Sequence, residues 1–243
     1  MGSLMHKVRL GSILLSLFFL FAGSLVGWLV GEDVIDREKT GSFLQFLVAI
    51  PSAILLFQLS IYRNATKWLG PQLKFLGSIS LTLAWFMIAL ALPVFWSDVV
   101  GIYPKILTIV IFFILCITNV RFSKESFDKQ WAQSGKSAFD KLFNKETTQI
   151  DWEKIIRSMK HDFDVYIPGL SKKSGNFVAI IAVGVLVIGH FIREIYPALS
   201  MMAWAFSFSI GASWCLQMGA YNIMHSQKVR GLEREYAIRF QAA

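Results

Sequence analysis

The sequence predicts an all-α integral membrane protein with six transmembrane helices and both termini in the cytoplasm. Hydrophobic residues make up 55% of the 243-residue chain and charged residues only 16%, whereas soluble domains carry about 45–50% and about 25% respectively. Six apolar runs approach the roughly 20 residues that cross a hydrocarbon core about 30 Å thick. The basic residues also fall in the segments that six spans would place on one side of the membrane.

The spans themselves follow from the apolar runs. A proline, Pro51, lies in the middle of the second run, where a missing backbone N–H predicts a kink, and Pro104 suits the first turn of the fourth. The first run is too long for the apolar part of a signal peptide, so we expect it to remain as a membrane helix. We expect spans at residues 10–30, 42–61, 75–95, 104–120, 176–192 and 198–218.

The distribution of charge sets the expected orientation, because lysine and arginine in short loops mark the cytoplasmic side. With six spans, the segments on one side hold all of the excess positive charge, which is +8 for the whole chain. We therefore expect a multi-pass protein of the plasma membrane, or of the inner membrane if the chain is bacterial. We divide the chain into a four-span region at 1–120, a cytoplasmic helical segment at 121–175, a transmembrane hairpin at 176–220 and a basic tail at 221–243.

The segment 121–175 contains two stretches with apolar residues close to helical spacing, which is typical of amphipathic helices. About 55 residues make a poor independent core, so these stripes must be buried against the membrane interface, the chain's own bundle or another subunit. The regular second stripe favours docking on protein. For the first stripe, the membrane interface and a protein surface stay equally open. The candidate docking residues are Phe127, Trp131, Phe139, Trp152, Ile155, Ile156 and Met159.

Small residues recur at four-residue spacing in the first and last spans, where they let helices approach closely. Two interpretations are open: packing within the chain, which we favour, and a face through which the chain assembles into an oligomer. The residues concerned are Gly23, Gly27 and Gly31 in the first span, and Ser207, Gly211, Cys215 and Gly219 in the last.

Three ionisable residues, His190, Arg193 and Glu194, share one helical face at the end of the fifth span. Ionisable residues inside a membrane are candidates for proton or ion handling, and histidine titrates near neutral pH. Because Tyr196 and Pro197 follow at once, the simpler interpretation is a polar hairpin tip, with His190 about one turn below it. Away from the span ends the expected membrane interior holds no Asp, Glu, Lys or Arg, which disfavours a proton-coupled transporter.

The chain contains no pattern for a cofactor or metal site, and we expect neither. No nucleic-acid-binding motif accompanies the basic charge, which suits loops beside anionic lipid. We therefore predict a non-enzymatic membrane subunit that assembles with itself or with partner proteins in the lipid bilayer and presents its cytoplasmic helical segment. The alternative is an oligomeric channel or small transporter. A membrane enzyme acting on lipid comes third, and its only candidate groups are His161, Asp162, Asp164 and His190.

Overall fold

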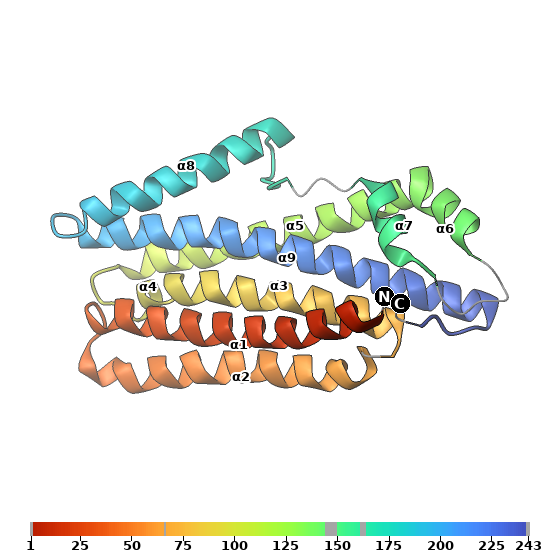
Figure 1. Cartoon of the computed structure of the whole chain (residues 1–243). Coiled ribbons are helices and arrows are strands. Elements are labelled where there is room, and N and C mark those ends of the chain that lie inside the picture. The colour runs from red at the N-terminus through yellow and green to blue at the C-terminus, as the bar shows by residue number, and fades with distance from the viewer. Residues whose placement is uncertain (1, 66, 144–149, 161–163, 242–243) are drawn as a thin grey trace.

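The computed structural model describes residues 2–65, 67–143, 150–160 and 164–241, and every regular element within them is helical (Figure 1). Within these described ranges, six stretches are long and apolar enough to cross a membrane. They confirm the prediction of an all-helical multi-pass protein with six spans. The stretches are Gly11–Glu32, Arg37–Ala65, Leu69–Trp96, Ile102–Leu142, Ser174–Phe191 and Pro197–Tyr236.

Several helices extend beyond the apolar runs from which we predicted them. The chain stays helical through the lysine, glutamate and glutamine residues that follow the fourth and sixth runs, since these residues are good helix formers. The second helix continues through Pro51. The elements are α1 (Gly2–Glu32), α2 (Arg37–Ala65), α3 (Leu69–Ala91), α4 (Pro93–Trp96), α5 (Ile102–Gln130), the π-helical turn η1 (Trp131–Gly135), α6 (Lys136–Leu142), α7 (Trp152–Met159), α8 (Lys172–Phe191) and α9 (Pro197–Tyr236).

Helices α3 and α9 form the centre of the bundle and share its most extensive contact. Helices α1 and α2 pack on α3, while α5 and α8 pack on α9 (Figure 1). The central pair can approach closely because a β-carbon at Gly77 would lie only 2.9 Å from the carbonyl oxygen of Gly219. Close backbone approach of this kind is how membrane helices gain packing contacts without a hydrophobic drive.

The outer helices expose large apolar side chains, among them Phe21, Leu56, Phe113 and Ile180. A soluble monomer rarely exposes contiguous apolar patches of more than a few hundred Å². Surfaces of this kind on α1, α2, α5 and α8 suit contact with lipid chains.

At one end, α9 continues past α1, α2 and α3 (Figure 1). Its 40 residues measure about 60 Å at 1.5 Å per residue, roughly twice the thickness of a hydrocarbon core. We call η1, α6, α7 and residues 221–236 of α9 the platform, and the end of the bundle where they lie the platform end. Helix α1 begins at the same end (Figure 1). The C-terminal segment packs back on the bundle, since the Leu69 N–H donates to the Phe240 carbonyl at 3.1 Å.

Candidate functional site

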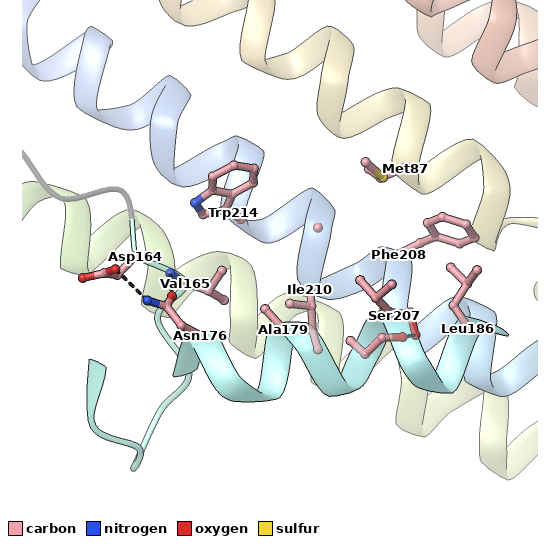
Figure 2. A pocket seen from close by; sticks show the side chains of 13 residues that line it. Met87, Asp164, Val165, Asn176, Ala179, Leu186, Ser207, Phe208, Ile210 and Trp214 are labelled. Carbon is pink, nitrogen blue, oxygen red and sulfur yellow. Dashed lines mark hydrogen bonds between the residues drawn. The ribbon is translucent and has the colours of Figure 1, made fainter. Parts of the chain in front are cut away.

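A cleft of about 490 Å³ lies between α8 on one side and α3 and α9 on the other (Figure 2). Helix α8 is held to α9 at the Ser207 hydroxyl, which donates to the Ala182 carbonyl at 2.7 Å, and at Gly189, which lies against Trp204. Toward its first turn α8 diverges from α9 (Figure 1), so the opening is wedge-shaped. Its lining is Met87, Asp164, Val165, Asn176, Ala179, Ala182, Val183, Leu186, Ser207, Phe208, Ile210, Gly211 and Trp214.

Polar groups gather at the platform end of this cleft (Figure 2). The Asn176 side-chain amide donates to the Asp164 carboxylate at 2.8 Å, and its oxygen accepts the Val165 backbone N–H at 3.2 Å. A β-carbon at Gly175 would overlap the Val165 carbonyl oxygen, so glycine lets this segment press on the first turn of α8. The cleft therefore combines apolar walls with a polar mouth, a combination that suits a ligand with an apolar tail and a polar head.

A polar seam joins α5 to α9 within the bundle, and we define it as Asn119, Ser123, Ser213 and Gln217. The Asn119 amide donates to the Tyr166 carbonyl at 2.9 Å, and the Ser123 hydroxyl donates to the Gln217 carbonyl at 3.1 Å. Both side-chain amide atoms of Gln217 are buried without a hydrogen-bond partner among the described residues. A buried unsatisfied amide is unfavourable, so Gln217 is a costly residue to bury at this helix contact.

The three predicted ionisable residues lie at the end opposite the platform, where all three line one open pocket of about 730 Å³ together with Asp33. Arg193 donates to the Asp33 carboxylate at 2.8 Å, which ties the α8–α9 turn to the α1–α2 turn. The exposed His190 ring stacks with Trp204 at a centroid distance of 6.3 Å, and Glu194 is exposed. No hydrogen bond or ion pair joins the three within the described chain. Their role as an ion site stays a prediction.

The same end carries a carboxyl pair that sequence analysis missed. Asp36 and Asp98 lie beside each other, and Asp98 also forms an ion pair with Lys39. A hydrogen bond from the Asp36 carboxyl lowers the pKa of Asp98, and the Lys39 ammonium lowers it further. The same hydrogen bond raises the pKa of Asp36. These contacts link the α1–α2 turn to the loop after α4.

The glycines of the first span face other helices of the same chain. Gly23 lies against Phe86 of α3, and a β-carbon at Gly27 would lie 2.6 Å from the Ala89 carbonyl oxygen of α3. Gly31 packs against Phe43 of α2. The structure therefore uses this series for packing within the chain, and the face is not open to a second copy.

The small residues of the last span are likewise used inside the bundle. Ser207 bonds α8, Gly211 faces Met87 of α3, and Cys215 is buried. A β-carbon at Gly219 would lie 3.0 Å from the Gly77 carbonyl oxygen. Within one chain, these positions set how closely α9 approaches α3 and α8.

The candidate docking residues lie in the platform and, for Phe127, at the adjoining end of α5, and their apolar side chains cluster with those of α9. Trp152 donates from its indole N–H to His225 Nδ1 at 3.2 Å, and the Trp131 ring lies between Trp152 and Phe139 in a chain of ring contacts. Ile156 is partly buried beside this cluster. The buried cluster comprises Leu69, Leu73, Phe127, Trp131, Phe139, Ile150, Trp152, Ile155, Met159, Tyr221, Val229, Leu232 and Phe240.

Sequence analysis missed the cleft and His225. Asn176 was predicted only as the first residue of a span. Its position after a Pro-Gly turn and a serine-capped helix start could have indicated a polar helix end at the membrane surface. Of the candidate lipid-enzyme groups, His161 and Asp162 lie outside the described residues, and Asp164 lies far along the chain from His190. No group of three or more His, Cys, Asp or Glu residues is placed to hold a metal ion in the described ranges.

Comparisons of this chain with protein-family models, with curated proteins and with solved structures found no match.

Proposed function

We propose that the chain is a non-enzymatic subunit of the plasma membrane that assembles with itself or with partner proteins and holds the platform on the cytoplasmic side. Basic residues in the segments at the platform end support this orientation. An even number of spans puts both ends of a chain on the same side of the membrane. With the platform in the cytoplasm, both termini would therefore be cytoplasmic.

One observation carries this proposal: the uninterrupted helix α9 connects the centre of the bundle to the platform. The aromatic rings of Phe127, Tyr221 and Trp152 surround His225 on this helix, and His225 is fully buried. The platform is therefore held in a fixed position relative to the membrane. Its outer faces carry exposed charged residues such as Asp140 and Arg157, which suit a polar protein contact.

Site-specific photo-crosslinking in native membranes tests this role. Crosslinkers at positions 140 and 157 are expected to yield adducts of discrete protein mass. A crosslinker at position 113, on the lipid-facing surface of α5, serves as the control and should yield lipid adducts. Protein adducts at position 113 with none at 140 and 157 would overturn the role of the platform in assembly.

The polar seam favours a second candidate function, an oligomeric channel or small transporter. Gln217 presents a buried amide between two membrane helices, and polar groups are expensive to bury in a membrane, which makes this amide a candidate for lining a pathway. In liposomes, ion flux that falls in Gln217→Leu and persists in Gln58→Leu would support this function. Gln58 is the matched control, since it serves a contact of α2 with Thr82 of α3 at 2.9 Å. Absence of flux under every imposed gradient would exclude it.

A further inference from the structure

We propose that a pocket at the end of α9 binds the phosphate of an anionic phospholipid in the membrane leaflet at the platform end. Three arginines, Arg230, Arg234 and Arg239, would hold this phosphate through their guanidinium groups. The binding goes beyond the proposed assembly role and does not depend on it.

The pocket is formed by the last turns of α9 and the segment that follows them, and it measures about 380 Å³. This volume falls within the roughly 300–1,000 Å³ that is typical of small-ligand sites. Helix α9 ends at Tyr236, and Ala237 adopts the left-handed conformation of a helix C-cap. The chain then turns back, which brings Arg239 to the same pocket as Arg230 and Arg234. The lining residues are Arg230, Glu233, Arg234, Ala237, Ile238 and Arg239.

The three arginines of the pocket are available to an anion. All three are exposed, and among the described residues no carboxylate forms an ion pair with Arg230, Arg234 or Arg239. Arg239 instead lies over the Trp68 ring, 4.1 Å from its centroid. Arginine keeps its charge at physiological pH, and its planar guanidinium can donate two parallel hydrogen bonds to one phosphate.

The negative charges beside the pocket do not cancel the arginines. Glu233 is the one acidic residue in the described lining, and its carboxylate accepts the Phe240 backbone N–H at 3.0 Å. The exposed Glu235 is not part of the lining. Since the C-terminus of α9 adds the equivalent of about half a negative charge, the lining keeps an excess of about 1.5 positive charges. An anionic ligand is therefore favoured over a neutral or cationic one.

The position of the pocket favours a lipid as the source of the phosphate. A β-carbon at Gly70 would lie 3.6 Å from Cγ of Arg230, and Gly70 lies in the first turn of the membrane-compatible stretch Leu69–Trp96. Trp68, which stacks under Arg239, directly precedes this stretch, and tryptophan is enriched at membrane surfaces. Helical side chains point toward the N-terminus of their helix, so the arginine stems of α9 point toward the bilayer. The guanidinium groups would therefore meet lipid headgroups.

Native mass spectrometry of the full chain tests this site after detergent washing and addition of phosphatidylglycerol and phosphatidylethanolamine, with the same acyl chains, in equal amounts. The wild type should bind phosphatidylglycerol in preference. Arg230→Gln/Arg234→Gln should lower this preference at least about fivefold, because two charged contacts to one phosphate are lost. The matched control, Lys154→Gln/Arg157→Gln, removes two exposed positive charges from α7 of the same platform and should retain the preference. Equal loss in both double variants, or no preference in the wild type, overturns the site.

A substitution of Glu233 tests the charge argument with the opposite sign. Glu233→Gln removes the acidic charge from the lining, while its side-chain oxygen can still accept the Phe240 N–H. The preference for phosphatidylglycerol should therefore rise about 2- to 5-fold. An unchanged or lower preference overturns the assignment of an anion to this pocket.

A soluble phosphate compound is the other source of the same chemistry, and competition distinguishes the two. A large excess of glycerol 3-phosphate should leave phosphatidylglycerol bound, because this compound lacks the acyl chains that hold a headgroup beside the pocket. Displacement of the lipid by glycerol 3-phosphate in the wild type would assign the pocket to a soluble phosphate and overturn the lipid as its ligand.

Discussion

Gly27 illustrates how one hydrogen atom in place of a methyl group sets the spacing of two membrane helices. A β-carbon there would meet the Ala89 backbone oxygen, and a backbone atom cannot move aside as a flexible side chain can. Gly11, on the same helix, has nothing within 4 Å of its β-carbon position. The two glycines therefore differ in packing while sharing the same helical environment.

Gly27→Ala is expected to lower the free energy of unfolding by about 1–2 kcal/mol. Overpacking costs about 1–3 kcal/mol, and the better helix propensity of alanine offsets up to about 1 kcal/mol of it. Gly11→Ala should leave stability unchanged or raise it slightly. Reversible unfolding in mixed micelles measures both variants, and equal effects of the two substitutions would contradict the close packing of α1 on α3.

The Asp36–Asp98 pair predicts a titration order. Asp36 should titrate above the ordinary value of 3.8 and Asp98 below it, because the proton on Asp36 is shared with the Asp98 carboxylate. The depressed pKa of Asp98 means that its ion pair with Lys39 contributes stability above the unfolded pKa and loses it as the pH falls through the lower folded value. The raised pKa of Asp36 acts in the opposite sense, since its contribution is present at low pH and is lost as the pH rises through the folded value. Carboxyl ¹³C resonances followed against pH test the order, and coincident titrations would contradict the pairing.

At the residue scale, spacing predicted close helix contacts at Gly23, Gly27 and Gly31 but did not identify their partners. Four-residue spacing shows only that one face of a helix carries small residues. Whether α3, α2 or a second chain covers that face depends on the loops and on the order in which helices pack. The Asp36–Asp98 pair was invisible for the same reason, because its members are separated by two membrane helices in the sequence.

The platform shows what the helical elements contribute. The stripe of Trp152, Ile155 and Met159 correctly indicated an apolar face that must be covered, and the structure covers it with the extension of α9. That extension was not predicted, because hydropathy falls where α9 leaves the apolar run while helix formation continues through Lys228, Arg230 and Glu233. An apolar run shows which part of a helix lies in an apolar environment. Where the helix ends depends instead on helix propensity and packing.

Trp152→Ala is expected to release α7 from α9. Truncation of a buried tryptophan costs about 3–5 kcal/mol, and the substitution also removes the hydrogen bond to His225. Limited proteolysis should then cleave residues 131–160 faster while the membrane helices remain protected. Arg157→Ala is the control, since its pair with Glu153 is exposed and contributes little. Cleavage at the wild-type rate in Trp152→Ala would show that the indole does not hold the platform.

The molecule as a whole follows from one physical constraint, which is that backbone groups inside a bilayer must be satisfied within the chain. Apolar runs therefore predicted six helices, and the structure contains six of suitable length. Their arrangement around α3 and α9 could not be predicted from the sequence, because the apolar runs differ little in composition. The cleft was also beyond it, since its shape depends on the angle between α8 and α9.

The orientation of the whole molecule predicts which positions can be labelled from outside. In a background without Cys116 and Cys215, Tyr103→Cys at the end opposite the platform should react with a membrane-impermeant maleimide in intact cells. Lys154→Cys in the platform should react only after the membrane is permeabilised. Both positions are exposed, so burial does not explain a difference. The reverse labelling pattern would place the platform outside the cell.

Assembly is the central claim at the scale of the whole molecule, and the mass of the complex after gentle extraction tests it most directly. Native mass spectrometry of the protein from its own membranes should give a discrete species heavier than the 27.5 kDa chain, composed of several copies or of the chain with identified partners. A single chain with bound lipid alone, obtained under conditions that preserve other membrane complexes from the same extract, would contradict the proposed role as an assembling subunit.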